Sequence, residues 1–267
     1  MKVERGNPTR PPLKGWERGK QIVESQKLMK KLMIIIAAMV LGTGAVAYAG
    51  NPGFGQRRYT VTGLVEYSYN TTWGHHGNID LQALMPINQH FEMEAKMQFS
   101  TANVHTGVLQ IRPKFELPVG EMFIETDLMY RAIARNKIGD IVAAVGVGYR
   151  MDHVSITIGS FCRVMDDWTR DWHSEDNYVV EPFNLLYRIE VFCRPQNNNW
   201  NLSFMFSNVD DYQMERMWQP LFSIGAWYDV TEHWRLNFAA QCKPTGMFHL
   251  NANFYGATFR TGFSYRF

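Results

Sequence analysis

Hydrophobic and polar residues alternate one by one along most of the chain from Tyr59 onward. The segment 90–100 shows this most clearly, because apolar residues occupy every second position and polar or charged residues fill the others. The two sets are Phe91, Met93, Ala95, Met97 and Phe99 on one face, and Glu92, Glu94, Lys96, Gln98 and Ser100 on the other. Successive side chains of a β-strand point to opposite faces. The pattern therefore predicts a strand with one apolar and one charged face.

Similar alternation recurs in short segments, and no tandem repeat or linker divides them. We expect strands at 59–70, 78–85, 90–100, 107–117, 121–132, 140–151, 153–164, 178–193, 200–209, 219–230, 233–241 and 255–267. Consecutive strands of this kind predict an all-β fold. The expected architecture is a closed antiparallel up-and-down β-barrel of about twelve strands. An even strand number places both termini at the same end of the barrel.

The expected connectors fall into two length classes that alternate along the chain. The short ones are 86–89, 118–120, 152, 195–199 and 231–232, and the longer ones are 71–77, 101–106, 133–139, 165–177, 210–218 and 243–254. Short turns at one end of a barrel and longer loops at the other are typical of barrels that span a membrane.

The final segment, 255–267, alternates aromatic and small apolar residues with glycine, hydroxyl and arginine residues. About a dozen residues suit a strand that crosses a bilayer at a tilt. The residues Arg260, Gly262, Tyr265 and Phe267 resemble the carboxy-terminal insertion signal of bacterial outer-membrane β-barrels. This resemblance extends to the whole chain after position 50, and it points to no subfamily.

The resemblance implies an export route and a location. Periplasmic chaperones would deliver the chain, the barrel-assembly machinery would insert it, and outer-membrane lipid would surround it. Both termini would then lie in the periplasm.

A soluble barrel such as a lipocalin, or a β-sandwich, is the alternative, with the apolar faces turned inward. Alternation alone does not separate the two arrangements. Aromatic residues near the strand ends favour the membrane barrel, because such residues form belts at membrane interfaces. They are Tyr59, Tyr69, Phe91, Phe99, Tyr149, Trp200, Trp218 and Trp234.

The beginning of the chain has the pattern of a secretory signal peptide at 29–49. A basic Met29-Lys30-Lys31 precedes the apolar run 32–41, and Ala47-Tyr48-Ala49 is a small-residue cleavage site. We expect cleavage after Ala49 in preference to retention as a membrane anchor. The segment 1–28 shows no helix or strand period, and we interpret it as a disordered extension upstream of the true start at Met29. The barrel then comprises 50–267.

Composition narrows the function classes. A net charge of +2 gives no reason to expect nucleic acid as a partner. Three cysteines, at Cys162, Cys193 and Cys242, are an odd number, and we expect free thiols. The mean hydropathy of −0.27 is compatible with a membrane barrel, since each lipid-facing residue is followed by a polar one. After position 50 the longest apolar stretch, around Ile141–Tyr149, is too short for a spanning helix.

The polar faces of the expected strands predict a lumen with unevenly distributed charge. We expect it to be lined by Glu66, Asp80, Glu92, Glu94, Lys96, Arg112, Lys114, Glu121, Glu125, Asp127, Arg150, Arg163, Arg188, Arg235, Arg260 and Arg266. Acidic residues come mainly from the first five strands and arginines from the later ones. Such a lumen either screens permeating solutes by charge or closes through salt bridges. A small porin-like channel, or a surface barrel without an assigned role, is the expected function.

Two other functions stay open. An outer-membrane lipid-modifying hydrolase would use Cys162, His173 and Glu181, with Cys162 opposite Glu181 on the lipid face. A structural or docking barrel would bind a partner through its external loops. No nucleotide, zinc or phosphate-binding motif is present in the sequence, so we expect no cofactor and no metal site.

Overall fold

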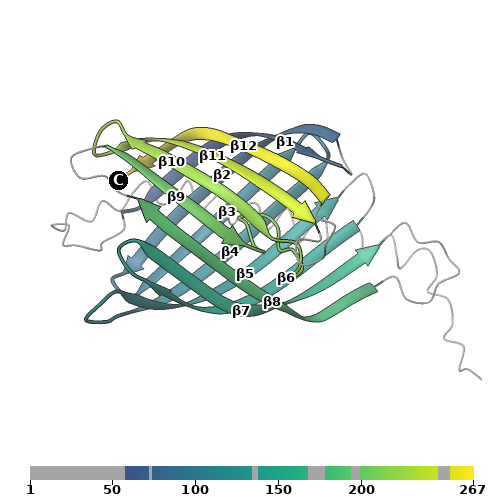
Figure 1. Cartoon of the computed structure of the whole chain (residues 1–267), viewed down its shortest axis with the longest axis horizontal. Helices are drawn as coiled ribbons and strands as arrows, with labels where there is room; N and C mark the ends of the chain where they lie inside the picture. The colour runs from purple at the N-terminus through teal and green to yellow at the C-terminus, as the bar shows by residue number, and fades with distance from the viewer. Residues whose placement is uncertain (1–57, 72–73, 134–137, 168–177, 194–198, 246–252) are drawn as a thin grey trace, which may run out of the picture. The chain divides into compact units, whose positions relative to one another are not determined.

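The computed structural model describes residues 58–71, 74–133, 138–167, 178–193, 199–245 and 253–267. The expected signal peptide at 29–49 and the segment 1–28 lie outside the described residues. The described chain forms twelve strands (Figure 1). They are β1 (Thr60–Asn70), β2 (Gly74–Asn88), β3 (Phe91–Ser100), β4 (Val104–Glu116), β5 (Glu121–Ile133), β6 (Ile138–Arg150), β7 (Val154–Asp167), β8 (Tyr178–Cys193), β9 (Trp200–Ser207), β10 (Leu221–Asp229), β11 (Trp234–Thr245) and β12 (Asn253–Arg266).

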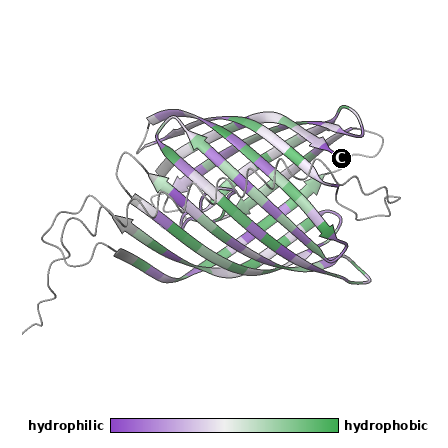
Figure 2. Ribbon diagram, turned by 180° about the vertical axis from the view of Figure 1, so that it is seen from behind, coloured by the Kyte–Doolittle hydropathy of each residue, from purple (hydrophilic) through white to green (hydrophobic). Residues whose placement is uncertain are grey.

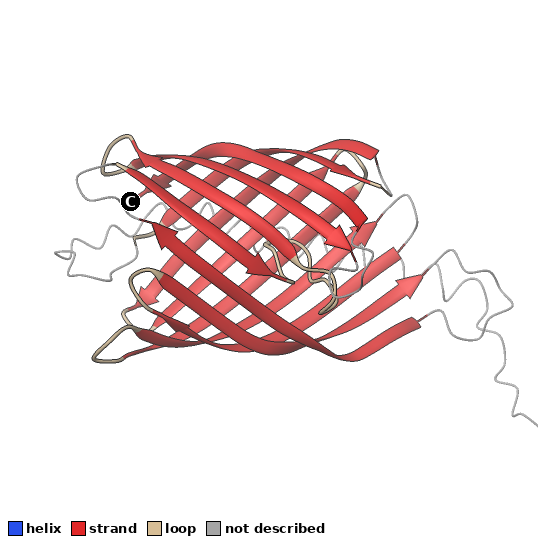
Figure 3. Cartoon of the chain, in the orientation of Figure 1, coloured by secondary structure: helices blue, strands red, loops and turns tan. Residues whose placement is uncertain are grey.

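The twelve strands close into one antiparallel barrel in which each strand pairs with its neighbours in sequence. Closure is made by β1 and β12, with Thr60 opposite Arg266 and Asn70 opposite Gly256. The described chain therefore starts and ends at the same end of the barrel, called here the terminal end. The predicted all-β barrel and its strand number are confirmed. Figure 3 shows strands and loops, and the described residues include no helix long and apolar enough to cross a membrane.

The outer face of the barrel is apolar, and the inner face carries the charged side chains together with one apolar cluster. On β1, Val65 is 63% exposed whereas the adjacent Glu66 is 3% exposed. On β12, Phe259 and Phe263 are each 58% exposed. Coloured by hydropathy, the strands show this alternation along their length (Figure 2). A lipocalin-like barrel has the opposite arrangement, with apolar side chains inside, so the soluble alternative is excluded by the burial pattern.

The signature residues of the last strand each have a structural role at the closure. Arg260 pairs with Glu66 inside the barrel. A side chain at Gly262 would overlap the backbone of Gly63 on β1, so this close approach of the two strands requires glycine. The rings of Tyr265 and Phe267 meet edge to face with centroids 4.9 Å apart at the terminal end. The pattern that resembles an insertion signal thus also seals the barrel.

The predicted alternation of short and long connectors is wrong for part of the barrel. The β1–β2 and β3–β4 connectors are only 71–73 and 101–103, because β2 and β4 begin earlier than their hydrophobic alternation does. In the second connector Asn103 adopts a φ of 59°, which asparagine tolerates in tight turns. The polar start of β2 is held by backbone pairing to β1, with Gly74 opposite Asn70. Hydrophobic alternation cannot reveal a strand extension of this kind.

Candidate functional site

The wall formed by β3, β4 and β5 carries a buried network of ion pairs. Arg112 pairs with Glu92 and lies 2.8 Å from Glu125. Lys114 lies 3.1 Å from the second oxygen of Glu92. Arg188 on β8 reaches the same Glu125 at 2.9 Å. Because β6 and β7 separate β5 from β8 in the barrel, this last contact crosses the interior.

Two further groups of charges lie on the inner face. Asp140 on β6 is contacted by Arg131 at 2.6 Å and by Arg163 at 3.4 Å. At the terminal end, Asp229 accepts hydrogen bonds from Arg235 at 2.7 Å and Arg266 at 2.6 Å. Arg131, Asp140 and Asp229 lie on strands expected from the sequence, but they were not among the predicted lumen residues. Their place on the polar face was the signal that could have identified them.

Every residue predicted to line the lumen is buried or half-buried. Within the described part of the chain, each of them except Asp127 takes part in an ion pair within 4.0 Å. Asp127 instead accepts a hydrogen bond from Gln110 at 2.7 Å. The interior is therefore a set of paired charges, and charged side chains in a low-dielectric enclosure require such partners.

The connection between β9 and β10 differs most from its prediction. It was expected to be an external loop at 210–218, but it folds into the barrel, where Val209, Tyr212 and Met214 are each 1% exposed. Residues 208–215 form a small hairpin, called here the inner hairpin, in which Val209 bridges Met214. The backbone N–H of Asp210 donates to the carbonyl of Gln213 at 2.9 Å.

The side chain of Asp210 stabilises the tip of this hairpin. Its Oδ1 accepts the backbone N–H groups of Tyr212 at 2.7 Å and Gln213 at 2.6 Å. Aspartate commonly closes turns in this way. Val209, Tyr212 and Met214 are interspersed with charged and polar residues, which is compatible with a short hairpin that buries one face. The sequence alone did not show that an enclosed surface was available to receive that face.

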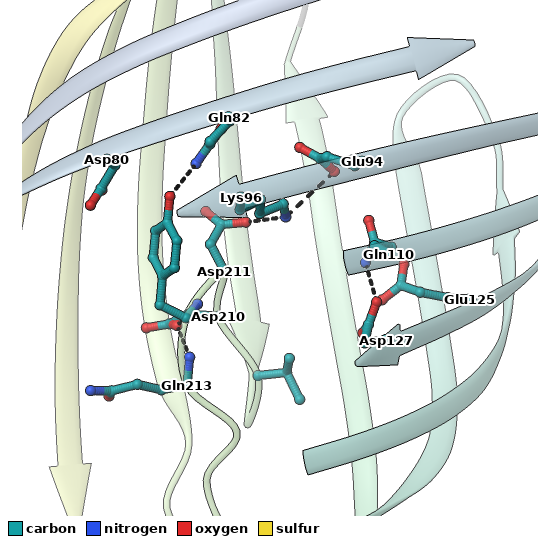
Figure 4. Close-up of polar contacts among 12 residues, drawn as sticks. Asp80, Gln82, Glu94, Lys96, Gln110, Glu125, Asp127, Asp210, Asp211 and Gln213 are labelled. Atoms are coloured by element: carbon teal, nitrogen blue, oxygen red, sulfur yellow. Dashed lines mark hydrogen bonds and ion pairs between the residues drawn. The ribbon is translucent and has the colours of Figure 1, made fainter. Parts of the chain in front are cut away.

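The tip of the inner hairpin is bound by three cations of the barrel wall. Lys96 on β3 lies 2.6 Å from Asp211, and Lys243 on β11 lies 3.1 Å from Asp210. Arg260 on β12 lies 3.3 Å from Asp211. We call Asp210, Asp211 and these three cations the clasp. Figure 4 shows Asp211 directed toward Lys96.

The clasp shifts the acidity of both hairpin carboxylates. Burial raises the pKa of Asp210, but Lys243 and Arg260 outweigh it and hold that pKa below its ordinary value. Burial also raises the pKa of Asp211, but the nearby charges of Lys96 and Arg260 outweigh this effect and lower it. Both side chains are therefore anions near neutral pH.

The hairpin also spans the interior through polar and apolar contacts. The hydroxyl of Tyr212 accepts from Gln82 on β2 at 3.3 Å and donates to the carbonyl of Met97 on β3 at 3.5 Å. Because the hairpin starts from β9, these contacts reach the opposite wall. Its apolar side chains belong to a buried cluster inside the barrel. The cluster comprises Val108, Met129, Val142, Ala144, Phe161, Leu186, Val209, Tyr212 and Met214.

The base of the inner hairpin lies beside β8, which pairs with β9 over only part of its length. β8 pairs with β9 only from Arg188 to Cys193. Next to this pairing, Asn208 donates from its Nδ2 to the carbonyl of Leu185 at 2.7 Å and accepts from the N–H of Tyr187 at 2.9 Å. Asn208 therefore continues the edge of β8 with its side chain and with its backbone N–H, which donates to the carbonyl of Tyr187 at 3.2 Å.

Of the candidate hydrolase residues, Cys162 and Glu181 are described, and they do not pair across β7 and β8. The register of β7 and β8 shifts between Phe161 and Arg163, and Glu181 lies opposite Arg163. The expectation that Cys162 faces Glu181 is wrong, because the bulge removes Cys162 from the pairing. Glu181 binds Arg216 at 3.0 Å, whereas Cys162 is exposed. His173 lies outside the described residues.

The cysteines and the possible metal ligands are the remaining reactive groups. The three cysteines are free, as expected from their number. Within the described ranges, no three His, Cys, Asp or Glu side chains are grouped so that they could hold a metal ion.

Comparison with known proteins identifies no family for this chain. No family model and no curated protein match the sequence. Among solved structures, a KdgM porin in complex with disordered oligogalacturonate is 9% identical, with a TM-score of 0.47, covering 78% of this chain and 99% of that one. A NanC porin is 10% identical, with a TM-score of 0.47 and coverages of 77% and 100%. Outer membrane phospholipase A from Escherichia coli is 12% identical, with a TM-score of 0.47 and coverages of 87% and 97%.

Proposed function

We propose that this protein is a porin-like barrel of the bacterial outer membrane, whose charged interior admits small polar solutes and is narrowed by the inner hairpin. The observation that carries the proposal is the inverted burial, with apolar side chains outside and ionised ones inside. Exposed apolar side chains such as Val65 and Phe263 are stable against acyl chains and costly in water.

The charged interior supports a passage better than a purely structural scaffold. Buried ion pairs add little stability compared with well-packed apolar residues of similar size. The pair between Arg188 and Glu125 therefore has no evident advantage for stability alone. Ionised groups are suited to an interior that contacts water and dissolved ions during part of its working cycle.

We also propose the orientation and processing that the last strand suggests. The terminal end faces the periplasm, the signal peptide is removed after Ala49, and the barrel-assembly machinery inserts the chain with β12 as the recognised strand. The seam between β12 and β1, where Arg260 meets Glu66, is then the last part of the barrel to close.

The acidic and basic sectors of the lumen act, in this proposal, mainly by pairing. Arg260 and Glu66 join the two sectors across the seam, and Arg188 and Glu125 join them across the interior. A solute would meet a nearly neutral polar surface in which local pairs, rather than two opposed walls, determine selectivity.

Planar-bilayer conductance tests this function. We would compare the purified protein with a variant in which residues 209–214 are replaced by a short Gly/Ser linker. Both proteins should form channels, and the variant should conduct several-fold better because the hairpin no longer crosses the interior. If neither forms channels, although both migrate as folded barrels on unheated gels, the channel proposal is wrong.

A further inference from the structure

The inner hairpin is not part of the pairing that closes the barrel. Ser207 on β9 lies opposite Leu221 on β10, so the strand pairing is complete at the base of the connection. Residues 208–220 form an excursion from that base. If the hairpin left the interior, β9 and β10 would stay paired and the barrel would stay closed.

The contacts that hold the hairpin are concentrated on a few side chains. Lys243 donates to Asp210 at 3.1 Å and also to Gln213, and both acceptors belong to the hairpin. Lys96 and Arg260, in contrast, also have partners on the wall. Lys96 lies 3.4 Å from Glu94, and Arg260 pairs with Glu66.

Because of this arrangement, the barrel wall keeps most of its ion pairs when the hairpin leaves the interior. Among the residues that the structure describes, two of the three clasp cations keep a partner on the wall without it, and Lys243 becomes an uncompensated charge. The opposing cost is the exposure of Val209, Tyr212 and Met214, which are buried in the apolar cluster. Besides the clasp and this cluster, the hairpin is held by the hydrogen bonds of Tyr212 to Gln82 and to the Met97 carbonyl, and by Arg163, which donates to the carbonyl of Met214.

We propose that the inner hairpin is a releasable plug. It obstructs the barrel interior while Asp210 and Asp211 are held by Lys96, Lys243 and Arg260, and it moves outward as a unit from its base beside Asn208. Its role as a gate rests on the proposed channel function. Its position and its release can be measured without any conductance.

Cysteine accessibility gives that measurement. In a background with Cys162, Cys193 and Cys242 replaced by alanine, Met214→Cys places a single thiol on the buried face of the hairpin. The matched control is Val119→Cys, on a turn at the terminal end where the native residue is 69% exposed. A water-soluble charged maleimide is applied to the protein in lipid vesicles or detergent micelles, and the labelling rates are compared.

For the intact clasp, we expect Met214→Cys to react at least about tenfold more slowly than Val119→Cys, since it reacts only after local opening. Adding Lys243→Gln, or Asp210→Asn with Asp211→Asn, should accelerate labelling at 214 several-fold and leave labelling at 119 unchanged. Asp152→Asn, an exposed acidic residue on a terminal-end turn, should change neither rate. Unheated gel mobility verifies that each variant is a folded barrel.

The outcomes separate this inference from the channel proposal. Rapid labelling at 214 with the clasp intact would show that the hairpin does not occupy the interior. Slow labelling at 214 that persists in the folded clasp variants would show that the hairpin stays in the interior permanently. Either result overturns the plug. If labelling behaves as expected and no variant conducts, the plug stands and the channel function fails.

Discussion

Two aspartates inside this barrel are each paired with two cationic side chains, but they differ in their exposure to water. Asp210 is held by Lys243 and Arg260, and the three side chains are 3%, 11% and 12% exposed. Asp229, at the terminal end, is held by Arg235 and Arg266, and those side chains are 30%, 28% and 21% exposed. The first set is largely removed from water, whereas the second is in contact with it.

The difference separates the parts of the lumen. Exposed ion pairs contribute about 0–1 kcal/mol because water and salt screen them. A buried pair adds little net stability, but loss of one partner leaves a charge without compensation. We infer that the terminal end is a wet vestibule and that the region around the inner hairpin is the closed part of the interior.

Removal of a shared carboxylate should give the largest contrast between these regions. Glu125→Ala would leave both Arg112 and Arg188 without their common partner, and we expect a loss of about 3–5 kcal/mol in the free energy of unfolding. Glu121→Ala, which breaks a half-exposed pair with Arg150 at 3.5 Å, should cost less than about 1 kcal/mol. Urea unfolding in lipid vesicles compares the two. Equal losses would remove the distinction between a dry interior and a wet end.

A substitution at the border of the two regions should have an intermediate effect. The ring of Phe123 lies against Gly148, with Arg112 and Arg150 each stacked near it at 5.3 and 5.4 Å. A Cβ at Gly148 would overlap that ring, so Gly148→Ala should cost about 1–3 kcal/mol.

Gly63→Ala is the matched control, because nothing lies within 4 Å of a Cβ at that position. It should be neutral, or stabilising by up to about 1 kcal/mol, since glycine is unfavourable within a strand. The same urea titration measures both variants. An unaffected Gly148→Ala would mean that Phe123 does not pack as described.

The sequence was sufficient for the architecture because the outer surface and the strand period impose the same alternation. All twelve strands, and the inward placement of residues such as Glu92 and Arg112, followed from that alternation. The inner hairpin did not, because its burial depends on cations contributed by β3, β11 and β12, which are distant in sequence. The early start of β2 at Gly74 and the bulge beside Cys162 were missed for a related reason. Backbone pairing, rather than hydrophobic alternation, determines them.

A smaller effect should follow from loss of one hydroxyl in the closed region. Tyr212→Phe keeps the ring in the apolar cluster and removes the hydrogen bonds to Gln82 and the Met97 carbonyl. We expect a loss of about 1 kcal/mol, measured as faster labelling of Met214→Cys. Tyr228→Phe, on β10, should leave that labelling unchanged. If Tyr212→Phe has no effect, the ring alone determines how the tip is held.

Moderate acidification should leave the release of the hairpin unchanged, which is the smallest effect that we predict. Asp210 and Asp211 have lowered pKa values because of Lys96, Lys243 and Arg260, which outweigh their burial. A carboxylate with a lowered pKa stabilises the folded state above its unfolded pKa of about 3.9 and loses that contribution only as the pH falls through the folded value. The labelling rate of Met214→Cys, divided by that of Val119→Cys, should therefore stay constant from about pH 7.5 to about pH 5. A rise of this ratio within that range would show that a group other than the clasp carboxylates controls the release of the hairpin.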